Sequence, residues 1–590
     1  MSLNSWLATP PNTTQKADMK RHLFSLTLAA VLALSCQSSD EAYAAPETQE
    51  LSALYADYLS GSYAHQIKDR AARQQFFTEA FESQPSDTRI GRRAMIFAIE
   101  QGDMDGAVDL AERVLKSNKT EPMARAILGV DAFRRGRESR ALKYLSGRTD
   151  DKTALILMQL TRGWVEVEDK DYKAARETFA TLSGDFNYFD TYAELQLAKV
   201  DALEGETEEA LERLDAVDET GISGIESLLT RVRILDNAGR QDEAIKAIED
   251  ILVDNERLAT GAIGNALASL KAGESLPKIS VKGEAARALT NPAFGFFFRN
   301  GSVEGAELFL RFAYWIDPSY TSASLGLASI LEDQGDEGEK VAYELYKAVG
   351  EDSPDYVSAQ LNLANIYLNW EEDDKSIAVL EKLNDREQST LTKSRLGLVR
   401  FFRENYAEAL PFYDSLINSL SEEELKENIE PLRFRGIIYE RLKRWPEAEA
   451  DFKRVLEYAP ADVDTLNYLG YTWVDRGENL TEAFDMIREA VKQEPESGAF
   501  VDSLGWAHYK LGEYEKAKVN LEKAVSLSPS SATIIDHLGD VYWKLGRKRE
   551  AGFQWKRALE FEPTDEERET IDIKLKGGLE AVPPKTDTLP

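Results

Sequence analysis

Small and apolar residues recur along this chain with a period close to 34 residues. In the C-terminal third, four glycines mark the repeat at spacings of 34, 35 and 34 residues: Gly436, Gly470, Gly505 and Gly539. Three positions after each glycine stands a side-chain ring, at Tyr439, Trp473, His508 and Tyr542. An alanine follows twelve or thirteen positions after the glycine, and a proline closes each unit. Apolar positions at helical spacing predict two helices per unit, and the proline ends the second one.

The same register continues towards the N-terminus. Gly397 is the preceding glycine anchor, and earlier anchors lie at Gly61, Met95, Gly129, Gly163, Ala198 and Val232. A small residue at the anchor lets the two helices of a pair approach closely. Because one pair cannot bury its apolar face alone, consecutive pairs must stack on one another. The pattern predicts an all-α superhelical solenoid of about 13–14 helix-turn-helix repeats.

One stretch interrupts the register. The segment KAGESLPKISVKGEAARALTNP, residues 271–292, breaks helical spacing with glycine, proline and β-branched residues. We therefore expect an N-terminal array at 51–254, an irregular unit or joint at 255–290, and a C-terminal array at 291–565. A terminal helix at 566–579 and a disordered tail at 580–590 would complete the chain. The alternative for the middle segment is one degenerate repeat.

Residues 1–35 are typical of an N-terminal extension followed by a signal peptide. Lys20 and Arg21 precede the twelve-residue apolar run LFSLTLAAVLAL, which is too short to span a bilayer. Met19 is a possible true start. Cys36 follows the run directly and is the only cysteine, so we predict lipidation at Cys36, with a tether at 36–50. The alternative is cleavage after Ala44, which would give an unlipidated periplasmic protein.

Charge and composition exclude several functions. Acidic residues outnumber basic ones 104 to 71, and a net charge of −33 repels phosphate backbones, so nucleic acid is not an expected partner. No phosphate-binding loop, H-E-x-x-H helix or EF-hand loop is present, and the repeat register leaves no free stretch for a catalytic module. We predict no catalytic residue, no metal site and no cofactor.

Repeat arrays commonly bind partners on the concave face, which the first helix of each pair lines. Aromatic and acidic residues dominate this face in the last repeats, and Trp and Tyr are frequent interface anchors. The candidate partner-binding residues are Tyr471, Asp502, Trp506, Tyr509, Asp540 and Trp543. The alternative role for these residues is packing between repeats.

Three segments carry a family resemblance: AFVDSLGWAHYKLGEYEKAKVNLEKAV (499–525), ATIIDHLGDVYWKLGRKREAGFQWKRAL (532–559) and ISVKGEAARAL (279–289). With them, almost the whole chain resembles the bacterial tetratricopeptide-repeat (TPR) lipoproteins, which include an outer-membrane adaptor of a carboxyl-terminal processing protease. The resemblance implies a TPR solenoid that faces the periplasm from the outer membrane, held there by a lipid anchor only.

The function that the resemblance implies is a non-catalytic adaptor that presents client proteins, the cell-wall hydrolases, to a periplasmic protease. Its partners would then be proteins. Two alternatives remain: a structural subunit of an outer-membrane assembly machine, and a TPR-fused enzyme with an unrecognised catalytic part.

Overall fold

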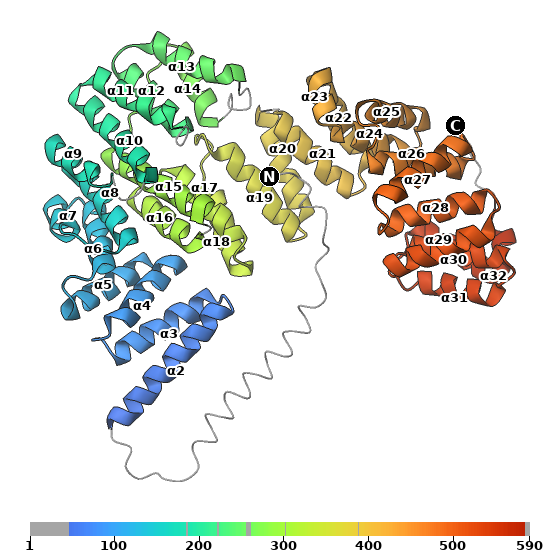
Figure 1. Ribbon diagram of the computed structural model, residues 1–590, viewed down its shortest axis with the longest axis horizontal. Helices are drawn as coiled ribbons and strands as arrows, with labels where there is room; N and C mark the ends of the chain where they lie inside the picture. The colour runs from blue at the N-terminus through green and yellow to red at the C-terminus, as the bar shows by residue number, and fades with distance from the viewer. Residues whose placement is uncertain are drawn as a thin grey trace. The chain divides into compact units, whose positions relative to one another are not determined.

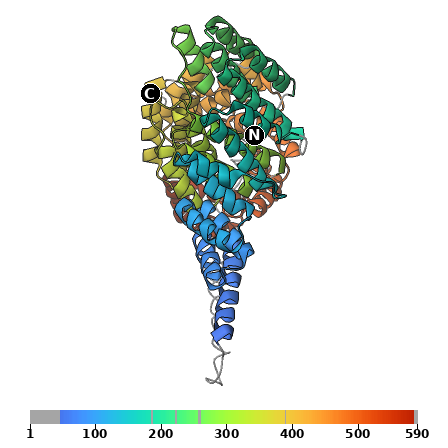
Figure 2. The ribbon, with the colours of Figure 1, turned by 90° about the vertical axis from the view of Figure 1, so that its left-hand side faces the viewer.

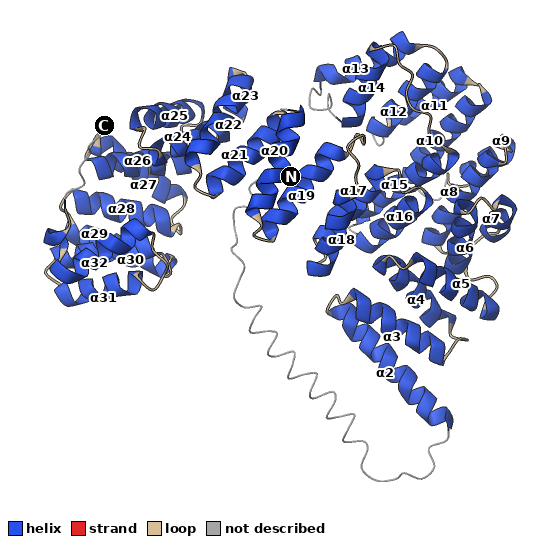
Figure 3. Ribbon diagram, turned by 180° about the vertical axis from the view of Figure 1, so that it is seen from behind, coloured by secondary structure: helices blue, strands red, loops and turns tan. Residues whose placement is uncertain are grey.

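A computed structural model describes residues 46–183, 187–220, 224–254, 261–300, 302–387 and 389–583. In this part of the chain the secondary structure consists of the α-helices α2 to α32 and one 3-10 helix, with no strand (Figure 3). The predicted all-α repeat solenoid is confirmed. The signal segment and Cys36 lie outside the described residues. The chain divides into two compact units, residues 1–359 (unit 1) and 360–590 (unit 2).

Unit 1 contains helices α2 to α18 and the start of α19. Their bounds are α2 (Pro46–Gln66), α3 (Arg70–Ser83), α4 (Thr88–Gln101), α5 (Met104–Ser117), α6 (Pro122–Arg134), α7 (Glu138–Leu145), α8 (Lys152–Glu168), α9 (Tyr172–Ala180), α10 (Asn187–Glu204), α11 (Thr207–Glu219), α12 (Gly224–Asn237), α13 (Gln241–Asp254), α14 (Gly261–Lys271), α15 (Val281–Asn300), α16 (Val303–Ile316), α17 (Thr321–Glu332) and α18 (Asp336–Lys347). In Figures 1 and 2 the pair α2–α3 stands at one end of this unit.

Unit 2 continues the succession of helix pairs. Its elements are α19 (Tyr356–Asn369), α20 (Asp373–Glu387), α21 (Thr390–Phe402), α22 (Tyr406–Ser419), α23 (Glu422–Glu427), α24 (Glu430–Arg441), α25 (Trp445–Tyr458), α26 (Val463–Arg476), α27 (Leu480–Gln493), α28 (Gly498–Lys510), α29 (Tyr514–Leu527), α30 (Ala532–Lys544), α31 (Lys548–Ala558), α32 (Asp565–Gly577) and the 3-10 helix η3 (Leu579–Ala581). Residues 579–581, placed partly in a disordered tail from the sequence, are therefore helical.

The anchor glycines lie where the two helices of a pair cross. A Cβ atom added at Gly163 would stand 2.4 Å from the ring of Phe179, and one at Gly436 would stand 2.7 Å from Phe452. The other signature glycines meet their partner helix in the same way, at Gly129, Gly397, Gly470, Gly505 and Gly539. The large side chain on the second helix fills the space that the missing side chain leaves. This contact lets the two helices of a pair approach closely.

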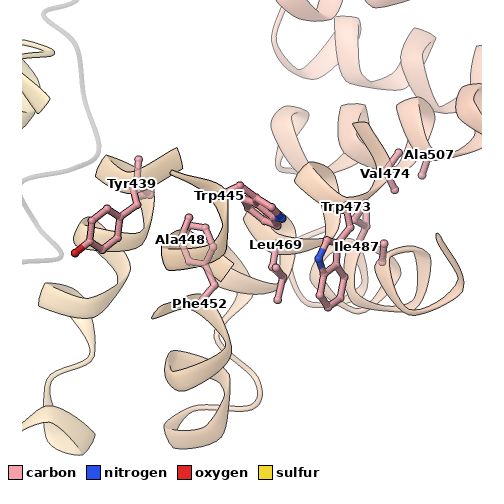
Figure 4. Close-up of a cluster of buried hydrophobic side chains, with 11 residues drawn as sticks. Tyr439, Trp445, Ala448, Phe452, Leu469, Trp473, Val474, Ile487 and Ala507 are labelled. Carbon is pink, nitrogen blue, oxygen red and sulfur yellow. The ribbon is translucent and has the colours of Figure 1, made fainter. Parts of the chain in front are cut away.

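Apolar side chains from consecutive pairs form a continuous core. In unit 2, Trp445 and Phe452 of α25 pack with Leu469 and Trp473 of α26 and with Ile487 of α27 (Figure 4). Each of these side chains is at most 9% exposed. Neighbouring repeats therefore share one core, so each stabilises the next.

Unit 1 departs from a simple succession of pairs. Helix α15 packs against α8 and α10, and α16 packs against α4 and α6, which are first helices of successive pairs. Figure 1 shows α15 and α16 on the inner side of the curve that α4 to α12 form. The chain thus folds back over the inner face of its own N-terminal repeats. Residues 255–290 do not divide two compact units as expected, because α15 joins the first unit, which extends to residue 359.

Candidate functional site

The inner face of unit 2 consists of first helices that carry the predicted partner-binding residues. Tyr471 lies on α26; Asp502, Trp506 and Tyr509 lie on α28; Asp540 and Trp543 lie on α30. Helical periodicity brings positions three and four residues apart to one side of each helix. Stacking of the repeats places these helices side by side, since α26 contacts α28 and α28 contacts α30.

Three rings form a stack on this face. The ring of Trp506 lies parallel to Tyr509, at 4.6 Å and 11° between planes, and to His537, at 4.1 Å and 17°. Trp506 and Tyr509 are half-buried, so both present part of their surface to solvent. In the described part of the chain, the indole Nε1 of Trp506 has no hydrogen-bond partner. The ring stack, Tyr509–Trp506–His537, therefore offers a partly exposed apolar surface, while the indole nitrogen of Trp506 is itself enclosed.

His537 fixes the inner side of the stack. Its Nδ1 lies 3.0 and 3.1 Å from the two carboxylate oxygens of Asp502, and the imidazole is only 7% exposed. Burial lowers the pKa of His537, but the charge and hydrogen bond of Asp502 outweigh burial, so the pKa is raised overall. This ion pair orients the ring on which Trp506 stacks.

Helix α32 closes the end of the inner face. Its Lys574 donates to Asp536 at 2.6 Å and to Asp540 at 2.8 Å, and Asp540 also accepts the indole N–H of Trp555 at 2.9 Å. Burial raises the pKa of Asp540, and the neighbouring Asp536 adds to the rise. Trp543 donates to Glu580 at 3.1 Å, beyond the end of α32.

Half of the predicted partner-binding set is therefore engaged within the chain. Asp502 and Asp540 are 6% and 4% exposed and both hold internal ion pairs. Trp543 is half-buried and bonded to Glu580. In the structure these three residues make contacts within the chain, which is the alternative role given to them from the sequence. Tyr471, Trp506 and Tyr509 keep partly exposed rings on the inner face and remain the candidate contacts.

Sequence reasoning missed the ion pairs that hold the fold-back in unit 1. Arg70 donates to both carboxylate oxygens of Glu307 at 2.7 Å, and Arg311 donates to Glu307 at 2.9 Å. Beside them, Arg73 pairs with Glu100. Burial raises the pKa of Glu100 to about 7, although Arg73 opposes the shift. We call these five residues the inner clamp.

A second group of polar contacts joins α15 to the same face. Lys199 of α10 lies 2.9 Å from Glu284 of α15 and 3.0 Å from Glu226 of α12. Lys282 donates to the carbonyl oxygen of Arg134 at 2.9 Å. The inner face of the N-terminal repeats is therefore occupied by the chain itself, through contacts that include ion pairs and a lysine-to-carbonyl hydrogen bond.

The described residues hold neither a metal-ligand cluster nor a membrane-spanning helix. The described residues contain no group of three or more histidine, cysteine, aspartate or glutamate side chains arranged to hold a metal ion. Among the same residues, no helix combines the length and apolar character needed to cross a bilayer.

Comparison with known families identifies the repeat in unit 2. A tetratricopeptide-repeat model matches residues 435–498, and a second TPR-repeat model matches residues 505–546. A curated relative, the TPR repeat-containing protein PA4667 of Pseudomonas aeruginosa, is 28% identical over 202 residues. That match covers 33% of this chain and 32% of the relative, so it spans about a third of either protein.

Comparison with solved structures gives matches of low overall similarity. The Cut9-Hcn1 hetero-tetramer of APC/C matches 89% of this chain and 96% of its own, at 15% identity and a TM-score of 0.35. A tetratricopeptide repeat protein from Parabacteroides merdae matches 50% of this chain and 98% of its own length, at 18% identity and a TM-score of 0.33. MamA from Desulfovibrio magneticus matches 29% of this chain and 94% of its own length, at 20% identity and a TM-score of 0.25.

Proposed function

We propose that this protein is an exported, non-catalytic scaffold that binds other proteins on the inner face of unit 2. The observation that carries the proposal is the partly exposed ring stack of Tyr509, Trp506 and His537. Tetratricopeptide arrays are protein-interaction scaffolds, and their concave faces are the usual binding surfaces.

The ring stack has the properties of an interface anchor. Trp and Tyr offer large rigid surfaces that cost little conformational entropy to bury, and they dominate the energetics of many interfaces. The rings are already fixed by one another and by the Asp502–His537 pair, so a partner would not have to order them.

The finer function we propose is that of an adaptor. A client held in unit 2 and a protease bound elsewhere on the scaffold would meet at a raised effective concentration, without any chemistry in the scaffold itself. The resemblance to TPR lipoproteins favours a periplasmic protease and cell-wall hydrolases as partners. Lipidation at Cys36 would keep the assembly at the outer membrane.

The test is a crosslinking pull-down from membranes with the full chain and two variants. Trp506→Ala removes the centre of the stack, and loss of a buried aromatic anchor of about 2 kcal/mol corresponds to roughly thirty-fold weaker capture. Phe553→Ala is the matched control, because Phe553 is an aromatic residue of a second helix, α31, and is 73% exposed.

The captured proteins decide between the proposals. A protease or hydrolase retained by the wild type and Phe553→Ala, but not by Trp506→Ala, would support the adaptor. Capture of outer-membrane assembly factors instead would favour the structural-subunit alternative. Equal capture by all three chains would exclude the ring stack as the binding surface.

A further inference from the structure

A cavity of about 460 Å³ opens inside unit 1, between helices α8, α10 and α12 and the extended segment 274–280. Its walls combine apolar and polar side chains. Among the residues that line it are Trp164, Lys199, Thr230, Arg233, Leu276 and Ile279. Its volume lies within the range of about 300–1,000 Å³ that is usual for small-molecule sites.

The carboxylates around this cavity already have partners. Glu284 is paired with Lys199 at 2.9 Å. Asp236 accepts the backbone N–H of Leu276 at 2.7 Å and the side-chain amide of Gln241 at 2.8 Å, so it holds the extended segment in place as one wall. These acids have little remaining capacity to neutralise a further cation.

Arg233 is a cation in the cavity wall without such a partner. Within the described residues its guanidinium forms no ion pair, and its one hydrogen bond is a long contact of 3.5 Å from Nη1 to the carbonyl oxygen of Leu229. Burial lowers the pKa of Arg233 and the nearby Arg287 lowers it further, and together they outweigh Glu226 and Glu284, which raise it. The folded protein therefore disfavours the charge on Arg233 as it stands, and an added anion would relieve that cost.

Thr230 lies one helical turn before Arg233 and also lines the cavity. Its side chain is 4% exposed, and its hydroxyl has no hydrogen-bond partner in the part of the chain that the structure describes. The hydroxyl oxygen is enclosed by surrounding atoms, so it does not face the cavity. Arg233 is therefore the donor that this side of α12 presents to the space.

We propose that this cavity binds a small organic monoanion, a carboxylate with an apolar body. Arg233 would donate to the carboxylate oxygens. Trp164 and Leu276 would cover the apolar part. A phosphate dianion fits less well, because a single cation is unpaired and the carboxylates of Asp236 and Glu284 also line the walls.

The first experiment is calorimetric titration of the full chain with phenylacetate and octanoate. We expect at least one of these carboxylates to bind. Phenylacetamide, which lacks the charge, should bind at least about tenfold more weakly. Inorganic phosphate should not compete with the carboxylate. Arg233→Gln should weaken binding at least about tenfold. Arg231→Gln is the matched control on the same helix, where Arg231 pairs with Asp215 and Asp218, and it should bind as the wild type does. Absence of carboxylate binding to the wild type, or wild-type binding by Arg233→Gln, would overturn the proposal.

The second measurement separates a ligand site from a structural role. Without ligand, Arg233→Gln should melt at the wild-type temperature or above it, because it removes a buried charge that lacks an ion-pair partner. Ligand should raise the melting temperature of the wild type and of Arg231→Gln only. A clear loss of ligand-free stability in Arg233→Gln would show that Arg233 serves the internal charges of Glu226 and Glu284, and the site would be refuted.

Discussion

Where the two helices of a repeat cross, the anchor residue has no room for a side chain. A Cβ atom at Gly539 would lie 2.5 Å from the indole of Trp555, whereas a Cβ atom at Gly552, in the second helix of the same repeat, would meet nothing within 4 Å. Two glycines in one repeat therefore have opposite roles: one permits a contact, and the other only weakens its helix.

Alanine at these two positions should change stability in opposite directions. Gly539→Ala should lower the free energy of unfolding by about 1–3 kcal/mol, because the indole of Trp555 must move. Gly552→Ala should raise it by about 0.5–1 kcal/mol, since alanine restricts the unfolded chain and favours helix. Urea denaturation followed by circular dichroism measures both, and destabilisation of equal size would contradict the crossing contact.

The pair of Asp502 and His537 predicts a dependence of stability on pH. Because the pKa of His537 is raised in the folded state above its ordinary value of 6.5, the folded protein binds the proton more tightly than the unfolded chain does. The stability that the pair contributes is complete below pH 6.5 and is lost as pH rises through the folded-state pKa. His537→Gln should therefore flatten the fall in melting temperature above pH 6.5. Parallel pH profiles of wild type and variant would contradict this.

Among the elements, α16 carries an apolar run that the sequence analysis treated as an ordinary part of the repeat. Every residue from Ala306 to Ala313 is buried, which is expected only of a helix covered on all sides. The run AELFLRFA is apolar around most of the helix. Within it, Glu307 and Arg311 stand four residues apart and pair with each other, and Arg70 from the other end of the unit completes the pair.

The inner clamp should hold the fold-back in place. Glu307→Gln leaves Arg70 and Arg311 buried without their shared carboxylate, and breaking a buried pair in this way costs roughly 3–5 kcal/mol. Hydrogen exchange should accelerate in α15, α16 and the faces of α4 and α6 that they cover. Glu243→Gln breaks an exposed pair with Arg240 and should leave exchange unchanged. Unchanged exchange in Glu307→Gln would show that apolar packing alone holds the fold-back.

Local patterns predicted the repeats because each pair is specified by residues within one period. Gly505 and Leu521, for example, meet sixteen positions apart in the chain. The fold-back was not predictable in this way, because Arg70 and Glu307 are 237 residues apart and neither belongs to the repeat signature. In the candidate site, the register indicated that Trp506 and Tyr509 share a face, but it did not indicate that His537 stacks on Trp506. The engagement of Asp540 did not follow from the register either, because it depends on where α32 places Lys574.

For the molecule as a whole, the two units have different inner faces. In unit 1 that face is filled by α15 and α16, and in unit 2 it carries the half-buried rings of Tyr471, Trp506 and Tyr509. Under the proposed function, clients would therefore bind unit 2. The outer faces, formed largely by second helices, would be left for other partners.

Attachment to a membrane can be tested cleanly because the charge of the chain opposes it. Cleavage before Cys36 would remove three basic residues and one acidic residue, so the net charge of −33 would become −35. Such a body is repelled by anionic lipid headgroups, and among the described helices none could cross a bilayer. Two or three acyl chains on Cys36 would then supply nearly all of the binding energy.

Cys36→Ala should shift the protein from the membrane fraction to the soluble periplasmic fraction, or leave an uncleaved precursor. Mass spectrometry of the wild type should find an acylated N-terminal cysteine, and an unmodified mature chain beginning at Ala45 would refute lipidation.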